Sequence, residues 1–104
     1  MAIVHRRTFV GKIGQADAIV KHLKAGDKMF KKYGGSLKTR VLSDHNSGRT
    51  DRVVWEWEGK DLGSMDAEMA RVMGNAKAKA EFDKWFAQLS GMIHYAEVDN
   101  FQTH

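Results

Sequence analysis

The 104-residue chain contains no cysteine and no proline. The lack of cysteine excludes a disulfide framework, a thiolate nucleophile and the ligand set of an iron–sulfur cluster. The chain has no run of about 18 apolar residues, so no segment is predicted to span a membrane. Its first residues form no apolar stretch behind a basic start, and we therefore expect no signal peptide and a cytoplasmic protein.

A chain of this length buries roughly 60–70% of the surface that its unfolded form exposes, which is enough for one core. We therefore predict a single domain over residues 1–104. The formal net charge of +4 at pH 7 raises the question of a nucleic-acid partner. A solvated helix face explains much of this charge, so neither a nucleic-acid nor a membrane partner is predicted. The lysines concerned are Lys12, Lys21, Lys24, Lys28, Lys31 and Lys32.

The strongest strand pattern lies in residues 50–59, Thr-Asp-Arg-Val-Val-Trp-Glu-Trp-Glu-Gly. Trp55 and Trp57 share one side of an extended chain, while Glu56 and Glu58 share the other. Two of the three tryptophans of the chain lie here, so this strand carries the largest apolar load of the sheet. The glutamates between them would repel phosphate, which argues against an RNA-binding sheet.

Alternation predicts a first strand over residues 3–10, with His5 and Arg7 on one face. Apolar residues at steps of three and four then predict a helix from about residue 15 to residue 33, ended by Gly34-Gly35. A glycine inside a helix costs about 1 kcal/mol relative to alanine. Gly26 within the apolar stripe therefore indicates that the helix approaches the sheet closely at this point.

Two further strands, over residues 36–44 and 50–59, flank a turn cluster at 44–48 and predict a hairpin. Asp61 is the expected N-cap of a second helix, which breaks at Gly74-Asn75 and continues with Asn75 as its cap. A closing strand covers residues 95–101. The order β-α-β-β-α-β predicts an α+β, ferredoxin-like fold, in which two helices cover one face of a four-stranded antiparallel sheet.

The uncovered face of this sheet is not cleanly polar. Apolar residues are spread among its charges, namely Val4, Val10, Leu42, Val54 and Ala96. A second copy of the chain would cover them, and we predict a homodimer in which two sheets face each other as an α/β barrel. The alternative is a monomer with a mixed open face.

Several short motifs resemble those of NIPSNAP-like proteins. Residues 4–9, Val-His-Arg-Arg-Thr-Phe, are similar to the first strand of that family, and residues 12–17, Lys-Ile-Gly-Gln-Ala-Asp, to the start of its first helix. Residues 55–58, 65–70 and 80–82 resemble its third strand and its broken second helix. The resemblance covers nearly the whole chain. It implies the dimeric α/β-barrel superfamily, which also contains antibiotic-biosynthesis monooxygenases, heme-degrading monooxygenases and small decarboxylase-like or isomerase-like enzymes.

The chain departs from this family at two places. The usual glutamate of the first strand is His5, and the usual Asp-Pro at the helix break is Gly74-Asn75. Heme-degrading relatives combine an asparagine on the first strand, a tryptophan on the third and a histidine on the second helix. The second helix here has no histidine, so heme would lack its expected ligand and no cofactor is predicted. An enzyme of this type would be a cofactor-independent monooxygenase or isomerase.

The candidate catalytic residues are His5 and Arg7. Arg7 would orient an anionic or enolic substrate, and His5 would act as a base near neutral pH. In the alternative, Arg7 pairs with Glu56 or Glu58 across the strands and His5 is structural. The candidate ligand-binding residues are aromatic, with core or interface packing as their alternative role: Trp55, Trp57, Phe86 and Tyr95.

These residues predict a cavity bounded by Trp55 or Trp57, by Phe86 and by the first helix, which holds a small apolar or aromatic ligand. The alternative function is a non-catalytic dimeric structural module, whose cavity is filled by its own side chains. Met65, Met69, Met73 and Met92 are interpreted as gap-filling core residues.

A metal site would need His5 and His94 to approach each other, with Glu97 as a third ligand. The chain has no spaced metal-binding motif, so none is predicted. It also has neither a Gly-x-Ser-x-Gly motif nor a phosphate-binding glycine loop.

Overall fold

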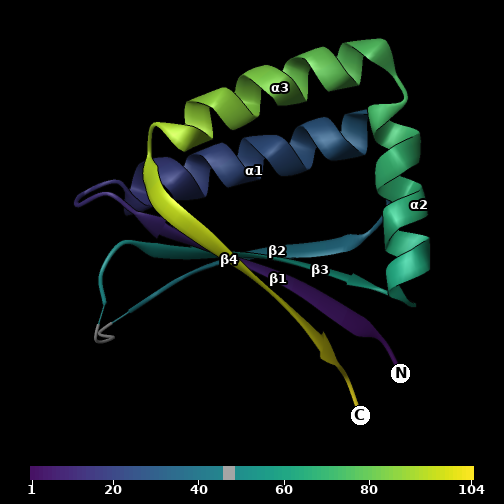
Figure 1. The fold of residues 1–104 in the computed structure, drawn as a ribbon, viewed down its shortest axis with the longest axis horizontal. Helices are drawn as coiled ribbons and strands as arrows, with labels where there is room; N and C mark the ends of the chain where they lie inside the picture. The colour runs from purple at the N-terminus through teal and green to yellow at the C-terminus, as the bar shows by residue number, and fades with distance from the viewer. Residues whose placement is uncertain (46–48) are drawn as a thin grey trace.

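The computed structural model describes residues 1–45 and 49–104. Its elements are β1 (Ile3–Gly11), α1 (Ala16–Lys32), β2 (Lys38–Ser43), β3 (Arg52–Gly59), α2 (Leu62–Met73), α3 (Ala76–Ser90) and β4 (Ile93–Gln102). The strands form an antiparallel sheet in the order β2-β3-β1-β4. Helices α1 and α3 run over one face of this sheet, and α2 stands at one end (Figure 1). The predicted α+β, ferredoxin-like fold is confirmed, with the second helix in two pieces. Within the described residues, no helix has the length and apolar character needed to cross a membrane.

The register of the central strands places the two β3 tryptophans under the helices. Trp55 pairs with Arg7 and Trp57 pairs with His5. Residues directly opposite one another in antiparallel strands point to the same face, so all four side chains lie on the helix side of the sheet. Glu56 pairs with Arg6, and both point to the face of the sheet opposite the helices, called the open side below.

The hydrophobic core lies between the helix side of the sheet and the helices. A Cβ on Gly26 of α1 would lie 2.7 Å from Cζ2 of Trp85 and 3.1 Å from Cη2 of Trp55. The predicted close approach of Gly26 to the sheet is thus confirmed, and Trp85 of α3 shares it. The buried residues of this core are Phe9, Ile19, Leu23, Phe30, Val53, Trp55, Val72, Ala78, Phe82, Trp85 and Leu89.

The second helix begins and restarts at the predicted caps. Asp61 accepts a hydrogen bond from the backbone N–H of Ser64 at 2.7 Å, and this bond lowers the pKa of the Asp61 carboxyl. Asn75 accepts hydrogen bonds from the backbone N–H groups of Lys77 and Ala78 at 2.9 and 3.2 Å. Each cap satisfies backbone N–H groups that a helix start leaves unpaired. The Asn75 cap thereby allows α3 to begin directly after the end of α2.

The start of α1 is capped from a distance. Gln15 makes no side-chain cap, but the Asp51 carboxylate accepts a hydrogen bond from the backbone N–H of Ala16 at 3.1 Å. Hydrogen bonds from Gly14 and Ala16 lower the pKa of this carboxyl. Asp51 has a φ of 61°, a left-handed conformation that directs its carbonyl oxygen to the N–H of Gly11 at 2.8 Å. Asp51 therefore ties the loop after β1 to the start of β3.

One sequence prediction about the open face is wrong. Ala96 pairs with the buried Phe9 and so lies on the helix side, because directly opposite residues of antiparallel strands share a face. The predicted turn at 44–48 includes residues 46–48, which lie outside the described residues. Strands β2 and β3 pair antiparallel, as the predicted hairpin requires, with Val41 opposite Trp55.

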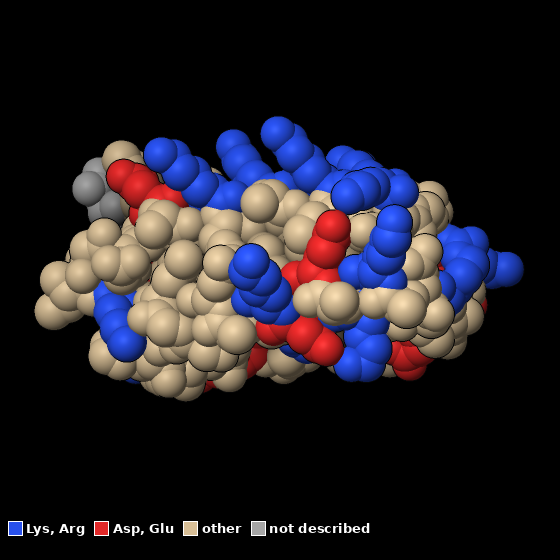
Figure 2. All heavy atoms as spheres, turned by 90° about the horizontal axis from the view of Figure 1, so that it is seen from above, with Lys and Arg blue, Asp and Glu red and all other residues tan. Residues whose placement is uncertain are grey.

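The outward side of α1 is basic. It carries the exposed residues Lys21, Lys24, Lys28, Lys31 and Lys32. Lysine and arginine side chains gather along one long side of the molecule in Figure 2. Lys32 pairs with Glu81 of α3 at 3.4 Å, which raises the pKa of Lys32. The amphipathic pattern of α1 thus has the solvated charged face that was predicted.

Candidate functional site

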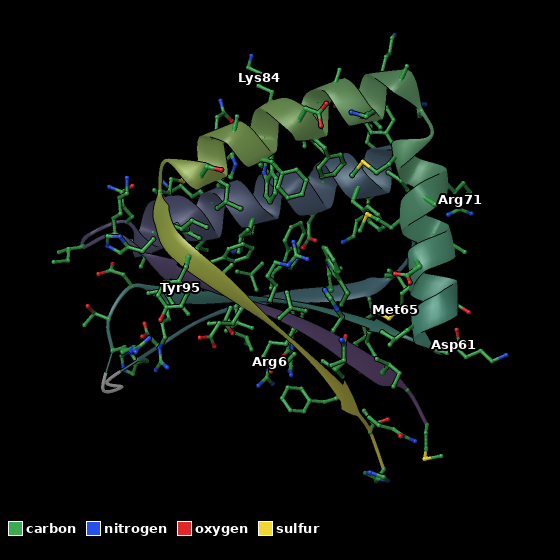
Figure 3. The ribbon with its side chains drawn as sticks, viewed as in Figure 1. Arg6, Asp61, Met65, Arg71, Lys84 and Tyr95 are labelled. Atoms are coloured by element: carbon green, nitrogen blue, oxygen red, sulfur yellow. The ribbon has the colours of Figure 1, made fainter. Side chains whose placement is uncertain are left out.

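A cavity of about 420 Å³ lies between the helix side of the sheet, α2 and α3. The strands contribute His5, Arg7 and Trp57 to its wall. Helix α2 contributes mainly apolar side chains at steps of three and four, which places them on one face: Leu62, Met65, Met69 and Met73. Met65 projects from α2 toward the sheet (Figure 3). The cavity therefore has a polar floor on the sheet and an apolar wall on α2.

The floor of the cavity is ordered by ring stacking and by one hydrogen bond. The imidazole of His5 stacks on the indole of Trp57, with centroids 5.4 Å apart and planes 8° apart. Trp55 meets Trp57 edge-on at 4.7 Å. Nδ1 of His5 lies 2.8 Å from Oδ1 of Asn100 on β4. A carboxamide oxygen only accepts hydrogen bonds, so this contact fits the tautomer in which Nδ1 carries the proton and Nε2 is the acceptor of the ring.

Two hydrogen-bond donors at this floor are unsatisfied. Nε of Arg7 and Nε1 of Trp57 are buried, and neither has a hydrogen-bond partner among the described residues. Burial also lowers the pKa of the Arg7 guanidinium from its ordinary value. Buried donors are nearly always paired, and an unpaired one costs about 1–3 kcal/mol. Both side chains line the cavity, and an acceptor that reaches these two atoms from it would satisfy them.

The predicted alternative for Arg7, an ion pair with Glu56 or Glu58, is wrong. Both glutamates point to the open side of the sheet, because Glu56 pairs with Arg6 and Glu58 pairs with Val4. Glu56 is only 3% exposed. Its carboxylate lies 2.6 Å from Nε of Arg6 and 2.6 Å from Nε of Arg40.

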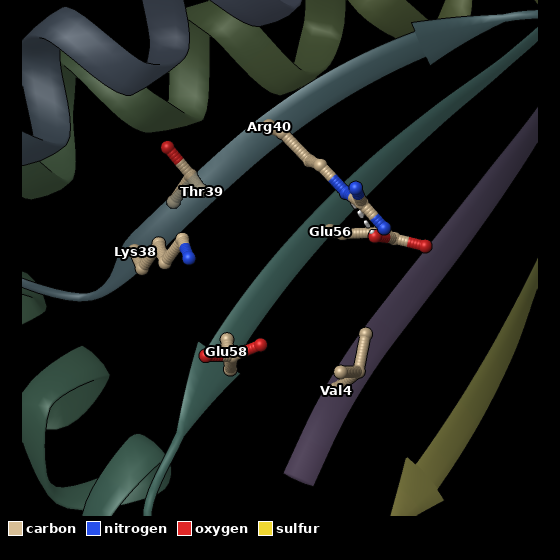
Figure 4. Close-up of a pocket in the computed structure, with 6 residues that line it drawn as sticks. All are labelled: Val4, Lys38, Thr39, Arg40, Glu56 and Glu58. Atoms are coloured by element: carbon tan, nitrogen blue, oxygen red, sulfur yellow. Dashed lines mark hydrogen bonds and ion pairs between the residues drawn. The ribbon is translucent and has the colours of Figure 1, made fainter. Parts of the chain in front are cut away.

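The pair of Arg40 and Glu56 borders a small hollow of about 120 Å³ on the open side (Figure 4). Burial alone would raise the pKa of the Glu56 carboxyl, but hydrogen bonds and attraction from the two arginines outweigh it, and the pKa is lowered. The open side is thus held by charges that satisfy one another, unlike Arg7 on the helix side.

The approach of His5 to His94 that a metal site would need does not occur. His5 faces Asn100, near the opposite end of β4 from His94. Six residues of strand separate these two positions along β4, a distance of roughly 20 Å. Within residues 1–45 and 49–104, no group of three His, Asp or Glu side chains could hold a metal ion.

The remaining predicted ligand-binding residues divide into three cases. Phe86 of α3 lines the cavity and is 42% exposed. Trp55 is a core residue that does not line it, and its Nε1 donates to Oδ1 of Asp27 at 2.9 Å. Tyr95 pairs with Val10 and therefore lies on the open side, where its hydroxyl accepts a hydrogen bond from Arg49 at 2.6 Å.

Sequence reasoning missed the contribution of α2. The cavity was expected to be bounded by the first helix, but α2 forms its long wall and α1 contributes no lining residue. Met65, Met69 and Met73 were interpreted as core. Their spacing of four residues was the available signal, because it puts three flexible apolar side chains on one helix face.

The charges at the cavity are nearly balanced at its rim and unbalanced at its floor. Lys79 and Asp83 of α3 pair at 2.9 Å, and Asp66 of α2 is exposed. Arg7 is the cation that lies on the sheet itself. A bound molecule would therefore meet a half-buried positive charge at the floor and exposed charges at the rim.

Several solved structures share this fold. An uncharacterised NIPSNAP domain protein from Burkholderia xenovorans has 17% identity and a TM-score of 0.77, over 98% of this chain and 94% of that one. A NIPSNAP family protein from Agrobacterium tumefaciens has 16% identity and a TM-score of 0.76, over 100% and 94%. A putative antibiotic biosynthesis monooxygenase from Bordetella bronchiseptica has 12% identity and a TM-score of 0.71, over 99% and 97%.

No protein-family model and no curated protein sequence matches the chain. At sequence identities of 12–17%, these comparisons show a shared fold. They confirm the predicted resemblance as a resemblance of fold. The chain has the α+β fold seen in NIPSNAP domain proteins and in an antibiotic-biosynthesis-monooxygenase-like protein.

Proposed function

We propose that this protein is a small homodimer of the NIPSNAP-like and monooxygenase-like type that binds a small apolar or aromatic ligand in the cavity between sheet and helices. The cavity itself carries the proposal. Its volume of about 420 Å³ falls within the roughly 300–1,000 Å³ typical of small-molecule sites. Its apolar wall and few polar groups are also typical of such sites. A structural module with a cavity filled by its own side chains would lack this space.

His5 and Arg7 supply the groups for a reaction that needs no cofactor. Nε2 of His5 would accept a proton from the bound molecule, since Nδ1 faces Asn100. The Arg7 guanidinium would stabilise the resulting anion at the floor of the cavity. Both residues line the same cavity, which supports the pair over the alternative that Arg7 is used in an ion pair.

The residues at the cavity do not fit heme. The histidine in its wall, His5, is stacked flat on Trp57 and bonded to Asn100, so its ring is not free to turn toward an iron. Helix α2 contributes no histidine. We therefore propose ligand binding without resident heme.

The binding test uses a neutral fluorescent naphthylamine and two matched phenylalanine variants. Phe86→Ala removes a ring that lines the cavity, and Phe101→Ala removes a ring of similar exposure, 48%, from the open side. We expect wild-type protein to bind one probe per chain. Phe86→Ala should weaken binding about tenfold, while Phe101→Ala should leave the affinity unchanged.

Thermal unfolding of both variants and sedimentation of each sample separate binding from loss of structure or assembly. A folded wild-type protein that binds no apolar probe would contradict the proposal. Equal weakening by both substitutions would contradict it as well, because the probe would then not be in the cavity.

The dimer is proposed from the open side of the sheet. Leu42, Tyr95 and Phe101 are 39%, 43% and 48% exposed there, and Arg6 and Arg40 are already paired with Glu56. Packing two such faces would remove these apolar groups from water. Native mass spectrometry should find a particle of two 11.8 kDa chains, and Leu42→Glu should shift it toward one chain. A wild-type monomer at submillimolar concentration would refute the dimer while leaving the cavity proposal standing.

A further inference from the structure

Arg7 differs from the other arginines of the described chain. Arg6, Arg40, Arg52 and Arg71 each form a salt bridge with a carboxylate. Arg49 donates to the hydroxyl of Tyr95. Arg7 has no salt bridge among the described residues, although burial makes an unpaired charge more costly there than at the surface. The group that satisfies Arg7 is therefore not a side chain described in this fold.

The second unsatisfied donor lies beside it. Trp57 faces His5, and His5 precedes Arg7 by two residues on the same side of β1. Arg7 and Trp57 are thus diagonal neighbours on one face of the sheet, which places their side chains within reach of one small group. Nε of Arg7 and Nε1 of Trp57 are both donors, so this group must offer hydrogen-bond acceptors to both.

A carboxylate meets these requirements. It is a monoanion with two oxygens, both of which only accept hydrogen bonds, and it pairs well with a guanidinium. A neutral carbonyl would satisfy the N–H groups but leave the Arg7 charge uncompensated. A phosphate dianion would bring a second negative charge toward Asp66 and Asp83 in the cavity wall, where Lys79 is already paired with Asp83.

The wall of the cavity on α2 indicates the character of the remainder of the ligand. Leu62, Met65, Met69 and Met73 form an apolar wall opposite the floor. Methionine side chains adapt to irregular apolar shapes, so the wall tolerates an aliphatic or an aromatic body. We infer that the cavity binds an amphipathic monocarboxylate, with its carboxylate on Arg7 and Trp57 and its apolar body against α2. This inference rests on the proposed function of the cavity and names its ligand class.

The test compares two probes of the same shape, 2-naphthoate and 2-naphthamide, by isothermal titration at pH 7. The first carries a carboxylate and the second a neutral amide on the same ring system. Wild-type protein should bind naphthoate at least tenfold more tightly than naphthamide. Arg7→Met should abolish this preference without lowering thermal stability, because it removes an unpaired buried charge and keeps the side-chain volume.

Two further variants locate the effect. Trp57→Phe keeps an aromatic ring but loses the N–H, and should reduce the preference severalfold. Lys84→Gln removes an exposed cation of α3 that does not line the cavity, and should leave the preference intact. A preference that survives in Arg7→Met would overturn the inference.

The outcomes separate the inference from the proposed function. If naphthamide binds as tightly as naphthoate, the cavity binds ligands but the carboxylate inference is wrong. If neither probe binds folded wild-type protein, both the inference and the proposed function fail. Unfolding of Arg7→Met would leave the comparison of the two probes in wild-type protein and in Trp57→Phe to decide the matter.

Discussion

The two sides of the sheet are held together by different interactions, although the same strands form both. On the helix side, Trp55 and Trp57 pack in a cluster of rings that reaches Trp85 of α3. On the open side, Glu56 stands between them in the sequence and joins Arg6 to Arg40. One side depends on the shape and size of its side chains, and the other depends on charge.

Each side of the sheet also contains side chains of the opposite character, namely a charged group on the apolar side and exposed apolar groups on the charged side. The apolar helix side holds Arg7, a half-buried cation without a salt bridge among the described residues. The charged open side holds Leu42 and Phe101, apolar groups in contact with water. These exceptions coincide with the two places where we propose a binding partner, a monocarboxylate at Arg7 and a second copy at the open side. Residues that conflict with their surroundings are expected at functional sites.

The largest expected effect tests the packed side. Trp55→Ala should lower the free energy of unfolding by about 3–5 kcal/mol, because it leaves a large cavity under rigid rings. Val54→Ala, one residue away on the open side, should lower it by about 1 kcal/mol or less. Urea denaturation of both variants measures the difference. Similar losses of unfolding free energy in Trp55→Ala and Val54→Ala would show that side-chain packing contributes equally to the two sides of the sheet.

Part of the contrast between the two sides could be predicted from the sequence because strand alternation is local. Period-two spacing places His5 and Arg7 on one face of β1, and it places the two tryptophans and Glu56 on opposite faces of β3. The break at Gly74-Asn75 follows from the cap chemistry of Asn75. These features depend on residues within a few positions of one another.

The position of β4 could not be predicted because it depends on long-range pairing. The register of β4 against β1 decides that Tyr95, opposite Val10, points to the open side and that Asn100, not His94, faces His5. A shift of one residue would move every side chain of a strand to the other face. The sequence of β4 does not signal this register, since nearly all of the strand is exposed.

The position of α2 relative to the sheet could not be predicted from the sequence either. Its cap and its apolar face are local features, but docking of that face over the end of the sheet depends on Gly59, where a Cβ would lie 2.5 Å from Cγ of Met65. Met65 is a core residue, and Met69 and Met73 pack against the core as predicted, while all three also line the cavity. Such tertiary contacts have no signature within one helix.

A smaller effect is expected from Gly26→Ala, which sharpens the comparison by testing shape without removing any ring. Alanine favours the helix by about 1 kcal/mol over glycine. Its Cβ would nevertheless meet Trp85 at 2.7 Å, and the buried indoles have no room to move. Overpacking costs typically about 1–3 kcal/mol, so we expect a net loss of stability in chemical denaturation.

Gly63→Ala is the matched control. Gly63 also lies within a helix, and its nearest potential contact is a carboxylate oxygen of Asp61 at 3.5 Å. This variant should be stabilised by roughly the helix-propensity difference alone. A gain of stability in both variants would show that α1 can withdraw from the sheet and that packing at Gly26 is loose.

The smallest effect is expected on the open side and appears as a pH dependence. The two arginines hold the pKa of Glu56 below its ordinary value in the folded protein, against the opposing effect of burial. The folded state therefore takes up this proton less readily than the unfolded chain does. The stability that the carboxylate contributes is present above the unfolded glutamate pKa, about 4.3, and is lost as the pH falls through the lower folded value.

Glu56→Gln should consequently be less stable than wild type at pH 7, by about 1–2 kcal/mol, since Arg6 and Arg40 keep access to water. Below about pH 4 the difference between the two proteins should shrink. Glu58→Gln, which alters a glutamate without a salt bridge in the described residues, should follow the wild-type curve. Urea denaturation from pH 3 to pH 7 measures all three. A constant gap between Glu56→Gln and wild type would mean that Glu56 stabilises the open side by packing, and the two sides would then depend on the same kind of interaction.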